Sequence, residues 1–146
     1  MADIEIKTEI KKPVEEVFQF VADLPNYPKW SPPASSMFIE NKVSPGPIGV
    51  GTTFEDKLHY GRVTGRVIEF KPNERIVFEQ KWYPDSHVLE MRVEYGFAPS
   101  NGNTQISHNS DIIPVELFTP MKGLLTDLCR EERQRTCGGI KTTLER

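Results

Sequence analysis

The chain has 146 residues, 37% of them hydrophobic and 27% charged, with a formal net charge of −3. This length and composition fit a single globular domain, residues 1–146, with a sizeable core. The acidic balance argues against nucleic acid as a partner, no apolar run is long enough to span a membrane, and the N-terminus lacks a signal-peptide core. We therefore expect a cytoplasmic protein that is a monomer or a weak homodimer.

The N-terminal part of the chain predicts a strand, two short helices and a second strand. Apolar and charged residues alternate over Ile4–Ile10, as in a half-buried strand. Pro13 fits the first turn of a short helix, where its missing N–H costs nothing. Residues 24–30 are rich in proline and predict a turn with one short helical piece, and residues 37–43 predict a strand.

The middle of the chain predicts a run of strands joined by short turns. Each segment alternates between apolar and polar residues, and Asn101-Gly102 is a strong hairpin signal before the last of them. The predicted strands cover residues 52–60, 62–70, 75–83, 87–97 and 104–112.

Residues 119–144 predict one long C-terminal helix. Thr119 suits the N-cap, and the inward stripe begins with Met121, Leu124, Leu125 and Leu128. The same face then turns polar, through Glu132, Thr136 and Gly139. The charged run 130–135 is either a solvated surface, with Glu131 and Arg135 paired, or the border of a partly hydrated cavity.

The two cysteines, Cys129 and Cys137, both fall in this predicted helix. Eight residues of helix separate them by about 12 Å, which is beyond disulfide reach. We therefore expect free thiols in a reducing compartment.

Together these elements predict an α+β fold. Consecutive antiparallel strands joined by short turns form a meander, whose apolar face needs a cover. The terminal helix is the only predicted element large enough to provide that cover.

Several motifs resemble the SRPBCC superfamily of START-like, helix-grip domains, in particular its polyketide cyclase/dehydrase-like branch. The resemblance covers essentially the whole chain, and the motifs occur in the same order and spacing. The segments that carry it are 12–18 (KPVEEVF), 23–30 with its NYPKW ending, 51–54 (GTTF), 70–78 (FKPNERIVF), 102–106 (GNTQI) and 139–145 (GIKTTLE).

This resemblance implies a seven-stranded, curved antiparallel sheet wrapped around the C-terminal helix, with two short helices closing one end. It also implies an apolar cavity between sheet and helix for a lipid, polyketide, hormone or other hydrophobic small molecule. Members without demonstrated enzyme activity are common in this superfamily, so the resemblance indicates the fold more specifically than the function.

The inner face of the predicted sheet contains the candidate ligand contacts. Its aromatic rings could stack on a flat ligand, although the same positions also suit ordinary core packing. His108, Gln80 or Tyr60 could fix a polar end of the ligand. The residues expected to line the cavity are Phe54, Leu58, Tyr60, Gln80, Trp82, Leu89, Met91, Tyr95, His108, Ser110, Leu124, Leu128 and Glu132.

The sequence shows no convincing catalytic set. Asp56, His108 and Glu132 are candidates for acid–base groups if they converge in the cavity. His108 and Ser110 are two residues apart on one strand, so we expect parallel side chains and a histidine with an ordinary hydrogen-bond partner.

No metal site or cofactor is expected. A metal site needs three ligands grouped closely, whereas the three histidines, His59, His87 and His108, fall on different predicted strands. The glycines of residues 46–51 precede a strand rather than a helix, unlike a phosphate-binding loop.

Three functions therefore remain open. The first is binding or transport of a hydrophobic small molecule, and the second is a polyketide cyclase/aromatase or dehydratase that uses acid–base residues in the same cavity. The third is a protein-interaction module that uses the outer face of the sheet.

Overall fold

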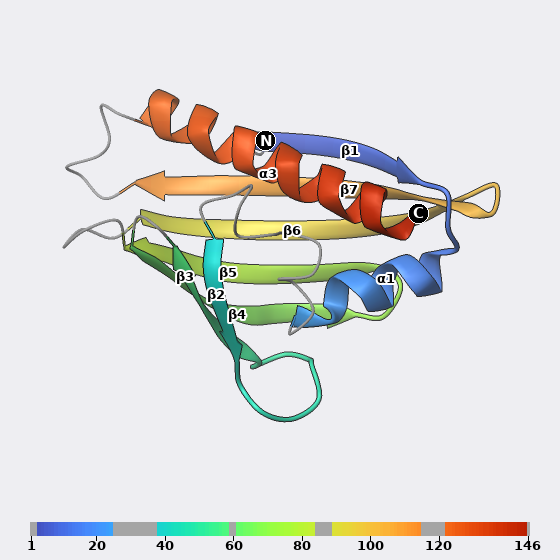
Figure 1. Ribbon diagram of the computed structural model, residues 1–146, viewed down its shortest axis with the longest axis horizontal. Helices are drawn as coiled ribbons and strands as arrows, with labels where there is room; N and C mark the ends of the chain where they lie inside the picture. The colour runs from blue at the N-terminus through green and yellow to red at the C-terminus, as the bar shows by residue number, and fades with distance from the viewer. Residues whose placement is uncertain (1–2, 25–37, 59–60, 84–88, 115–121, 146) are drawn as a thin grey trace.

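The computed structural model describes residues 3–24, 38–58, 61–83, 89–114 and 122–145, and the expected second short helix lies outside these ranges. Figure 1 shows the arrangement of the elements. In chain order they are β1 (Ile4–Ile10), α1 (Val14–Ala22), β2 (Phe38–Val43), β3 (Thr53–Leu58), β4 (Arg62–Lys71), β5 (Arg75–Tyr83), β6 (Leu89–Ser100), β7 (Asn103–Pro114) and α3 (Lys122–Leu144).

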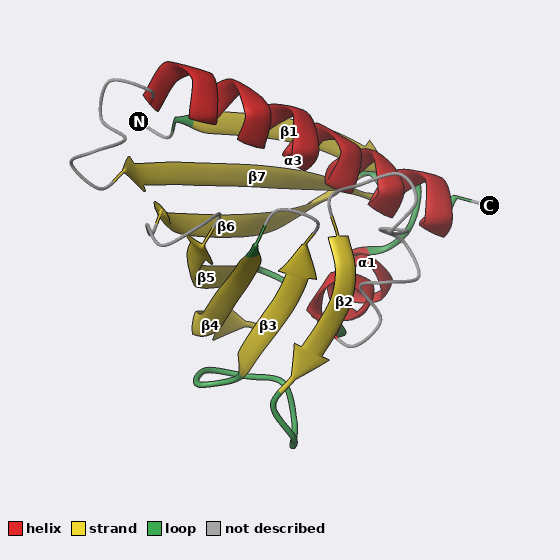
Figure 2. Cartoon of the chain, turned by 60° about the vertical axis from the view of Figure 1, so that its left-hand side comes forward, coloured by secondary structure: helices red, strands yellow, loops and turns green. Residues whose placement is uncertain are grey.

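The strands form one seven-stranded antiparallel sheet in the order β1-β7-β6-β5-β4-β3-β2. Six strands follow each other as a meander, and β1 joins it beside β7. Figures 1 and 2 show the sheet curving strongly, with α3 lying along β1 and β7 on its inner face. The predicted α+β helix-grip fold is confirmed.

The turn between β6 and β7 follows from its two residues. Asn101 has a φ of 53° and Gly102 a φ of 83°, and Ser100 pairs with Asn103 on either side of them. Two consecutive positive φ values suit the tight, twisted turn of a two-residue hairpin, which asparagine and glycine adopt at little cost. This turn aligns the two longest strands, which carry most of the candidate site.

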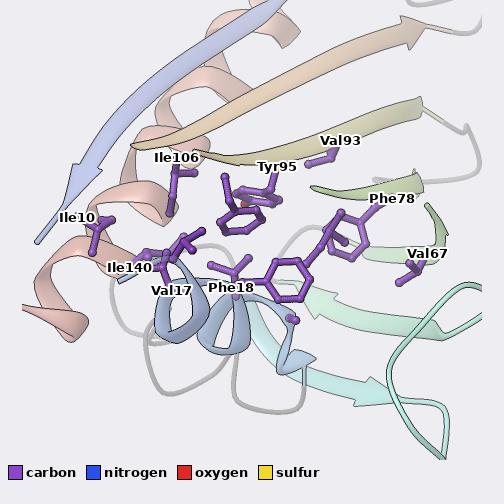
Figure 3. Close-up of a cluster of buried hydrophobic side chains, with 14 of the residues drawn as sticks. Ile10, Val17, Phe18, Val67, Phe78, Val93, Tyr95, Ile106 and Ile140 are labelled. Carbon is purple, nitrogen blue, oxygen red and sulfur yellow. The ribbon is translucent and has the colours of Figure 1, made fainter. Parts of the chain in front are cut away.

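Helix α1 covers one end of the inner face. Its inward residues are buried, as the spacing predicts, and Phe18 contacts Phe70 and Phe97 edge-on at centroid distances of 5.4 and 5.1 Å. Figure 3 shows Phe18 among side chains from the sheet and from α3, including Tyr95 and Ile140. Edge-to-face contacts of this kind stabilise aromatic pairs beyond the burial of their area.

The inner face of α3 differs from the predicted stripe. Leu124 is 57% exposed, whereas Thr136, Cys137 and Ile140 are at most 3% exposed. The prediction is confirmed at Thr136 and wrong at Leu124, and Gly139 is only half-buried because the buried side is centred one residue away, on Cys137 and Ile140. Cys137, Ile140 and Leu144 recur at spacings of three and four and lie on the side of the C-terminal half that turns inward.

Part of the predicted helix lies outside the described structure. This applies to the proposed cap at Thr119 and to the side chains of Leu125, Leu128 and Glu132. Neither of the two described helices, α1 and α3, is long and apolar enough to cross a membrane.

Candidate functional site

The described interior contains three buried polar side chains from the middle of the sheet. Gln80 on β5 is 8% exposed, His108 on β7 is fully buried, and Ser110 is 2% exposed. All three point inward because they occupy the same alternate positions as their apolar strand neighbours, including Phe78 and Ile106. A polar group in such a place is costly unless it is hydrogen-bonded.

His108 is held by its neighbours on β6 and β7. Its Nε2 lies 2.6 Å from the Oγ of Ser110, and the ring of Tyr95, its register partner, contacts it edge-on at 4.8 Å. The expected hydrogen-bonded histidine is confirmed. The expectation that the two side chains stay parallel is wrong, because the imidazole is long enough to reach along the strand toward the hydroxyl.

The other ring nitrogen of His108 has no partner among the described residues. Nδ1 is fully enclosed yet makes no hydrogen bond there. Burial, together with the positive charge of Arg133 as the smaller cause, lowers the pKa of His108 from 6.5 to about 3. The imidazole is therefore neutral near pH 7, with one N–H donor and one acceptor nitrogen.

Arg133 brings a positive charge from α3 toward the sheet. Its Nη2 donates a 2.9 Å hydrogen bond to Oε1 of Gln80, although Gln80 lies on β5 and the helix packs along β1 and β7. The same guanidinium opposes, through its charge, the burial that raises the pKa of Cys137 to about 11. Arg133 thus acts on three positions of the interior: Gln80, His108 and Cys137.

Arg133 is not among the residues that the sequence predicts to line the cavity. The run 130–135 is predicted to be either a solvated surface or the border of a cavity, and only part of the run fits the first interpretation. Glu131 and Arg135 are exposed, whereas Arg133 is half-buried. The sequence feature that indicates an inward-facing Arg133 is its spacing. Arg133 lies four residues before Cys137 and seven before Ile140, on the face that turns inward.

The polar residues lie between two apolar clusters. The larger cluster surrounds α1 and includes Phe78 and Val93, while the smaller consists of Ile4, Met91 and Ile112. Ser110 pairs with Val93 of one cluster and Ile4 of the other. Gln80 follows Phe78 on the same face and pairs with Met91. Trp82 packs against both clusters.

Most of the predicted ligand contacts that can be described lie on this inner face. Trp82 is half-buried there, while Leu124 is exposed instead. Buried on the inner face are Phe54, Gln80, Met91, Tyr95, His108 and Ser110. Tyr60 and the side chains of Leu58, Leu89, Leu128 and Glu132 lie outside the described structure.

The acid–base grouping gains no direct support from the described geometry. Asp56 is half-buried on β3, which lies four strands from the β7 of His108 in the sheet order. The side chain of Glu132 is outside the described structure, so a set of all three residues stays a prediction. Among the described residues, no three histidine, cysteine, aspartate or glutamate side chains are grouped as metal ligands.

The far end of the Phe54 ring lies over a glycine of the neighbouring strand. A side chain on Gly65, its register partner on β4, would overlap the Phe54 ring. The ring also meets Phe78 edge-on at 5.6 Å. The missing side chain at residue 65 therefore lets an aromatic ring cover the sheet near Gln80, which pairs with Gly65 on the other side.

A groove of ≈ 1090 Å³ lies on the outer face of the sheet. Its lining includes Thr64, Lys81, Glu90 and Ile113, which alternate with inward-facing residues. Ile113 is 55% exposed. Gln80, Phe54 and Met91, which are buried on the inner face, also belong to the lining of the groove. Among its charged residues, Lys81 pairs with Glu90 at 4.0 Å. Exposed pairs of this kind create no strong field of one sign.

Comparison with solved structures shows the same fold in several proteins. Protein CV1439 from Chromobacterium violaceum superposes with a TM-score of 0.70 at 21% identity, over 98% of this chain and 96% of that one. Ara h 8.0201 gives a TM-score of 0.76 at 14% identity, over 97% and 95% of the two chains.

A third similar structure is larger than this chain. The di-domain ARO/CYC protein StfQ from the steffimycin biosynthetic pathway gives a TM-score of 0.74 at 10% identity, over 98% of this chain. The match covers 51% of StfQ, so this chain spans about half of that protein's length. At these identities the similarity shows the fold alone.

The comparison of sequences assigns the family. No curated protein matches the chain at a significant level. A sequence model for polyketide cyclase / dehydrase and lipid transport proteins, in contrast, matches residues 1–145. The chain therefore belongs to the polyketide cyclase / dehydrase and lipid transport family.

Proposed function

We propose that this protein, over residues 1–146, is a carrier that binds a hydrophobic small molecule between the sheet and α3. The observation that carries the proposal is the polar set inside an apolar interior: Gln80 bonded to Arg133, and His108 with a buried Nδ1 that has no described partner. The family match supports the same class of function.

Charged and polar side chains are not needed for a stable core. Bringing a guanidinium and an imidazole into an apolar interior costs free energy that an apolar side chain would avoid. A ligand with an apolar body and a polar end offsets this cost by burying apolar area, at about 25 cal/mol per Å², and by bonding the polar residues. The two apolar clusters on either side would then contact the apolar body.

Native mass spectrometry of freshly purified protein tests this proposal. We expect an additional mass corresponding to a hydrophobic molecule, which organic extraction removes. Refolding the extracted protein in the presence of the recovered molecule should restore the complex. A single mass equal to the bare chain, together with no uptake of any compound from a lipid and polyketide extract, would rule the carrier function out.

Catalysis is the second candidate. In that mechanism His108 would accept a proton from a bound substrate. Its pKa of about 3 makes it a weak base, since an efficient general base has a pKa near the working pH. Binding without chemistry therefore fits the described geometry better.

The two candidates are separated by a turnover assay. The protein is incubated with poly-β-keto and β-hydroxyacyl thioesters, with unfolded protein as the control. We expect no cyclised or dehydrated product above the control. Turnover that disappears in His108→Phe would favour the enzyme.

A further inference from the structure

We propose that the protein forms a homodimer in which β2 pairs antiparallel with β2 of a second copy, so that the two sheets become continuous. This inference is independent of the carrier function. It follows from a difference between the two edge strands of the sheet, β1 and β2 (Figure 2).

Side chains of α3 bond to the backbone at the edge of β1. Arg130 donates a 3.3 Å hydrogen bond from Nη2 to the backbone oxygen of Asp3, just before the strand. Lys141 donates a 2.8 Å hydrogen bond from Nζ to the backbone oxygen of Glu9. These two carbonyl groups are therefore already occupied by the protein's own helix.

A third backbone group at this edge is occupied from the end of the same helix. The backbone N–H of Lys11, just after β1, donates to the carboxylate of Glu145 at 3.2 Å. In an antiparallel strand, alternate residues present their N–H and C=O groups to the same edge, so residues 3, 9 and 11 share the outer edge of β1. Covering a sheet edge in this way protects it from pairing with another chain.

The edge at β2 is open within the part of the chain that the structure describes. Strand β2 pairs with β3 on one side, and no described strand lies on the other. The backbone N–H of Ser44 donates to the oxygen of Thr53 at 2.8 Å, so the even-numbered residues from 40 onward direct their backbone groups toward β3. Asn41 and Val43 then direct theirs to the outer edge, where each offers one donor and one acceptor.

The sequence of β2 favours a second copy as the strand that pairs there. When Asn41 lies opposite Asn41 of the second copy, Glu40 of each copy lies opposite Lys42 of the other, which gives two pairs of opposite charge. A register shift of two residues places Glu40 opposite Glu40, or Lys42 opposite Lys42, and like charges directly opposite are destabilising. The strand is thus complementary to itself in one register, as a two-fold symmetric interface requires.

The backbone alternation favours the same register. Because Asn41 directs its N–H and C=O outward, the two copies of Asn41 would exchange two backbone hydrogen bonds on the symmetry axis. Glu40 and Lys42 would occupy the non-hydrogen-bonded positions beside them, where opposing residues are closest. The register between β2 and β3 shifts between Phe38 and Glu40, so we centre the pairing on residues 40–42 and expect a weak dimer.

Sedimentation equilibrium of the full chain tests the proposal. We expect the average mass to rise with concentration from the 16.7 kDa of one chain toward twice that value. The measurement extends to about 1 mM protein, so that weak association is also populated. A wild-type protein that stays a single chain at the highest concentration would overturn the proposal.

Charge reversal tests the register. Glu40→Lys and Lys42→Glu each place like charges at both pairs and should weaken the dimer about tenfold or more. In an equimolar mixture of the two variants, each charge of one copy meets an opposite charge of the other. The mixture should therefore dimerise about as tightly as the wild type, although neither variant does so alone. A mixture that associates no better than its components would overturn the proposed register.

Proline substitution tests the edge. Asn41→Pro removes an outward N–H but no bond between β2 and β3, so we expect a folded monomer by circular dichroism and sedimentation. Lys7→Pro is the matched control on β1, because Lys7 alternates with Glu9 and also directs its N–H outward. This control should dimerise as the wild type does. A dimer that survives Asn41→Pro, or one that is lost in Lys7→Pro, would overturn the assignment to β2.

Discussion

Arg133 on α3 donates a 2.9 Å hydrogen bond to the amide oxygen of Gln80 on β5, so one side chain joins the terminal helix to the middle of the sheet. The bond lies beside the boundary between the two apolar clusters. It links the fold to the proposed function, because the same guanidinium joins the helix to the sheet and belongs to the polar set on which the proposal depends.

The first prediction concerns the cost of removing the acceptor from this pair. Gln80→Leu leaves a partly buried guanidinium without its described acceptor at that position, and we expect the free energy of unfolding to fall by about 1–3 kcal/mol. Urea denaturation followed by circular dichroism measures it. Glu79→Gln is the matched control on the same strand. It breaks only the exposed ion pair with Arg66 and should change stability by less than about 1 kcal/mol. Equal effects of the two substitutions would contradict a structural role for the Arg133–Gln80 bond.

The second prediction concerns His108 and ligand choice. His108→Phe removes both ring nitrogens but keeps a flat, buried ring. It also leaves the Ser110 hydroxyl without its partner, so we expect a stability loss of about 1–2 kcal/mol. The double variant His108→Phe/Ser110→Ala should recover part of that loss. The set of molecules bound, compared by mass spectrometry, should shift toward less polar compounds, and an unchanged set would count against a ligand contact at His108.

The third prediction is a pH dependence of stability. The pKa of His108 is about 3 in the folded protein and near 6.5 when unfolded, so the unfolded chain binds the proton more readily. The stability that comes from keeping His108 neutral in the folded protein is fully present above pH 6.5. It is lost as the pH falls toward 3, and the free energy of unfolding then decreases by up to about 1.4 kcal/mol per pH unit.

Urea midpoints measured between pH 7.5 and pH 4 test this dependence. The wild-type midpoint should fall more steeply over this range than that of His108→Phe, which lacks the titrating group. Parallel curves for the two proteins would show that His108 is not held neutral by burial.

The fourth prediction concerns Gly65 and Phe54. Gly65→Ala places a methyl group where the Phe54 ring lies, and we expect a destabilisation of about 1–3 kcal/mol. Gly96→Ala is the control within the same sheet, since its new methyl would meet Ser107 no closer than 3.8 Å. Phe54→Leu should reduce the cost of Gly65→Ala in a double-mutant cycle. Additive effects would mean that the ring does not rest on Gly65.

The fifth prediction concerns the two thiols. Cys137 is 3% exposed and burial raises its pKa to about 11, whereas Cys129 is half-buried. Since the thiolate is the reactive form, iodoacetamide should alkylate Cys129 well before Cys137 at pH 8. Peptide mapping after timed quenching measures the order. Labelling of both at the same rate under native conditions would contradict the burial of Cys137.

The sequence by itself determined the strands and their inward faces. Over Asn103–Pro114, for example, alternate positions from Thr104 to Ile112 are buried as the two-residue period requires. A strand has only two faces, so one clear alternation is enough to choose between them. The position of the last hairpin also follows from local sequence, because Asn101 and Gly102 both tolerate the positive φ that a two-residue turn requires.

Only the tertiary structure decided the inner face of α3 and the partners of its polar residues. A helix with a mixed sequence such as residues 129–140 has several faces of similar polarity, and the sheet selects the one that buries Cys137 and Ile140. That choice turns Arg133 toward Gln80, which is 53 residues away in sequence. A contact between such distant residues depends on the curvature of the sheet, and no local pattern in either segment encodes it.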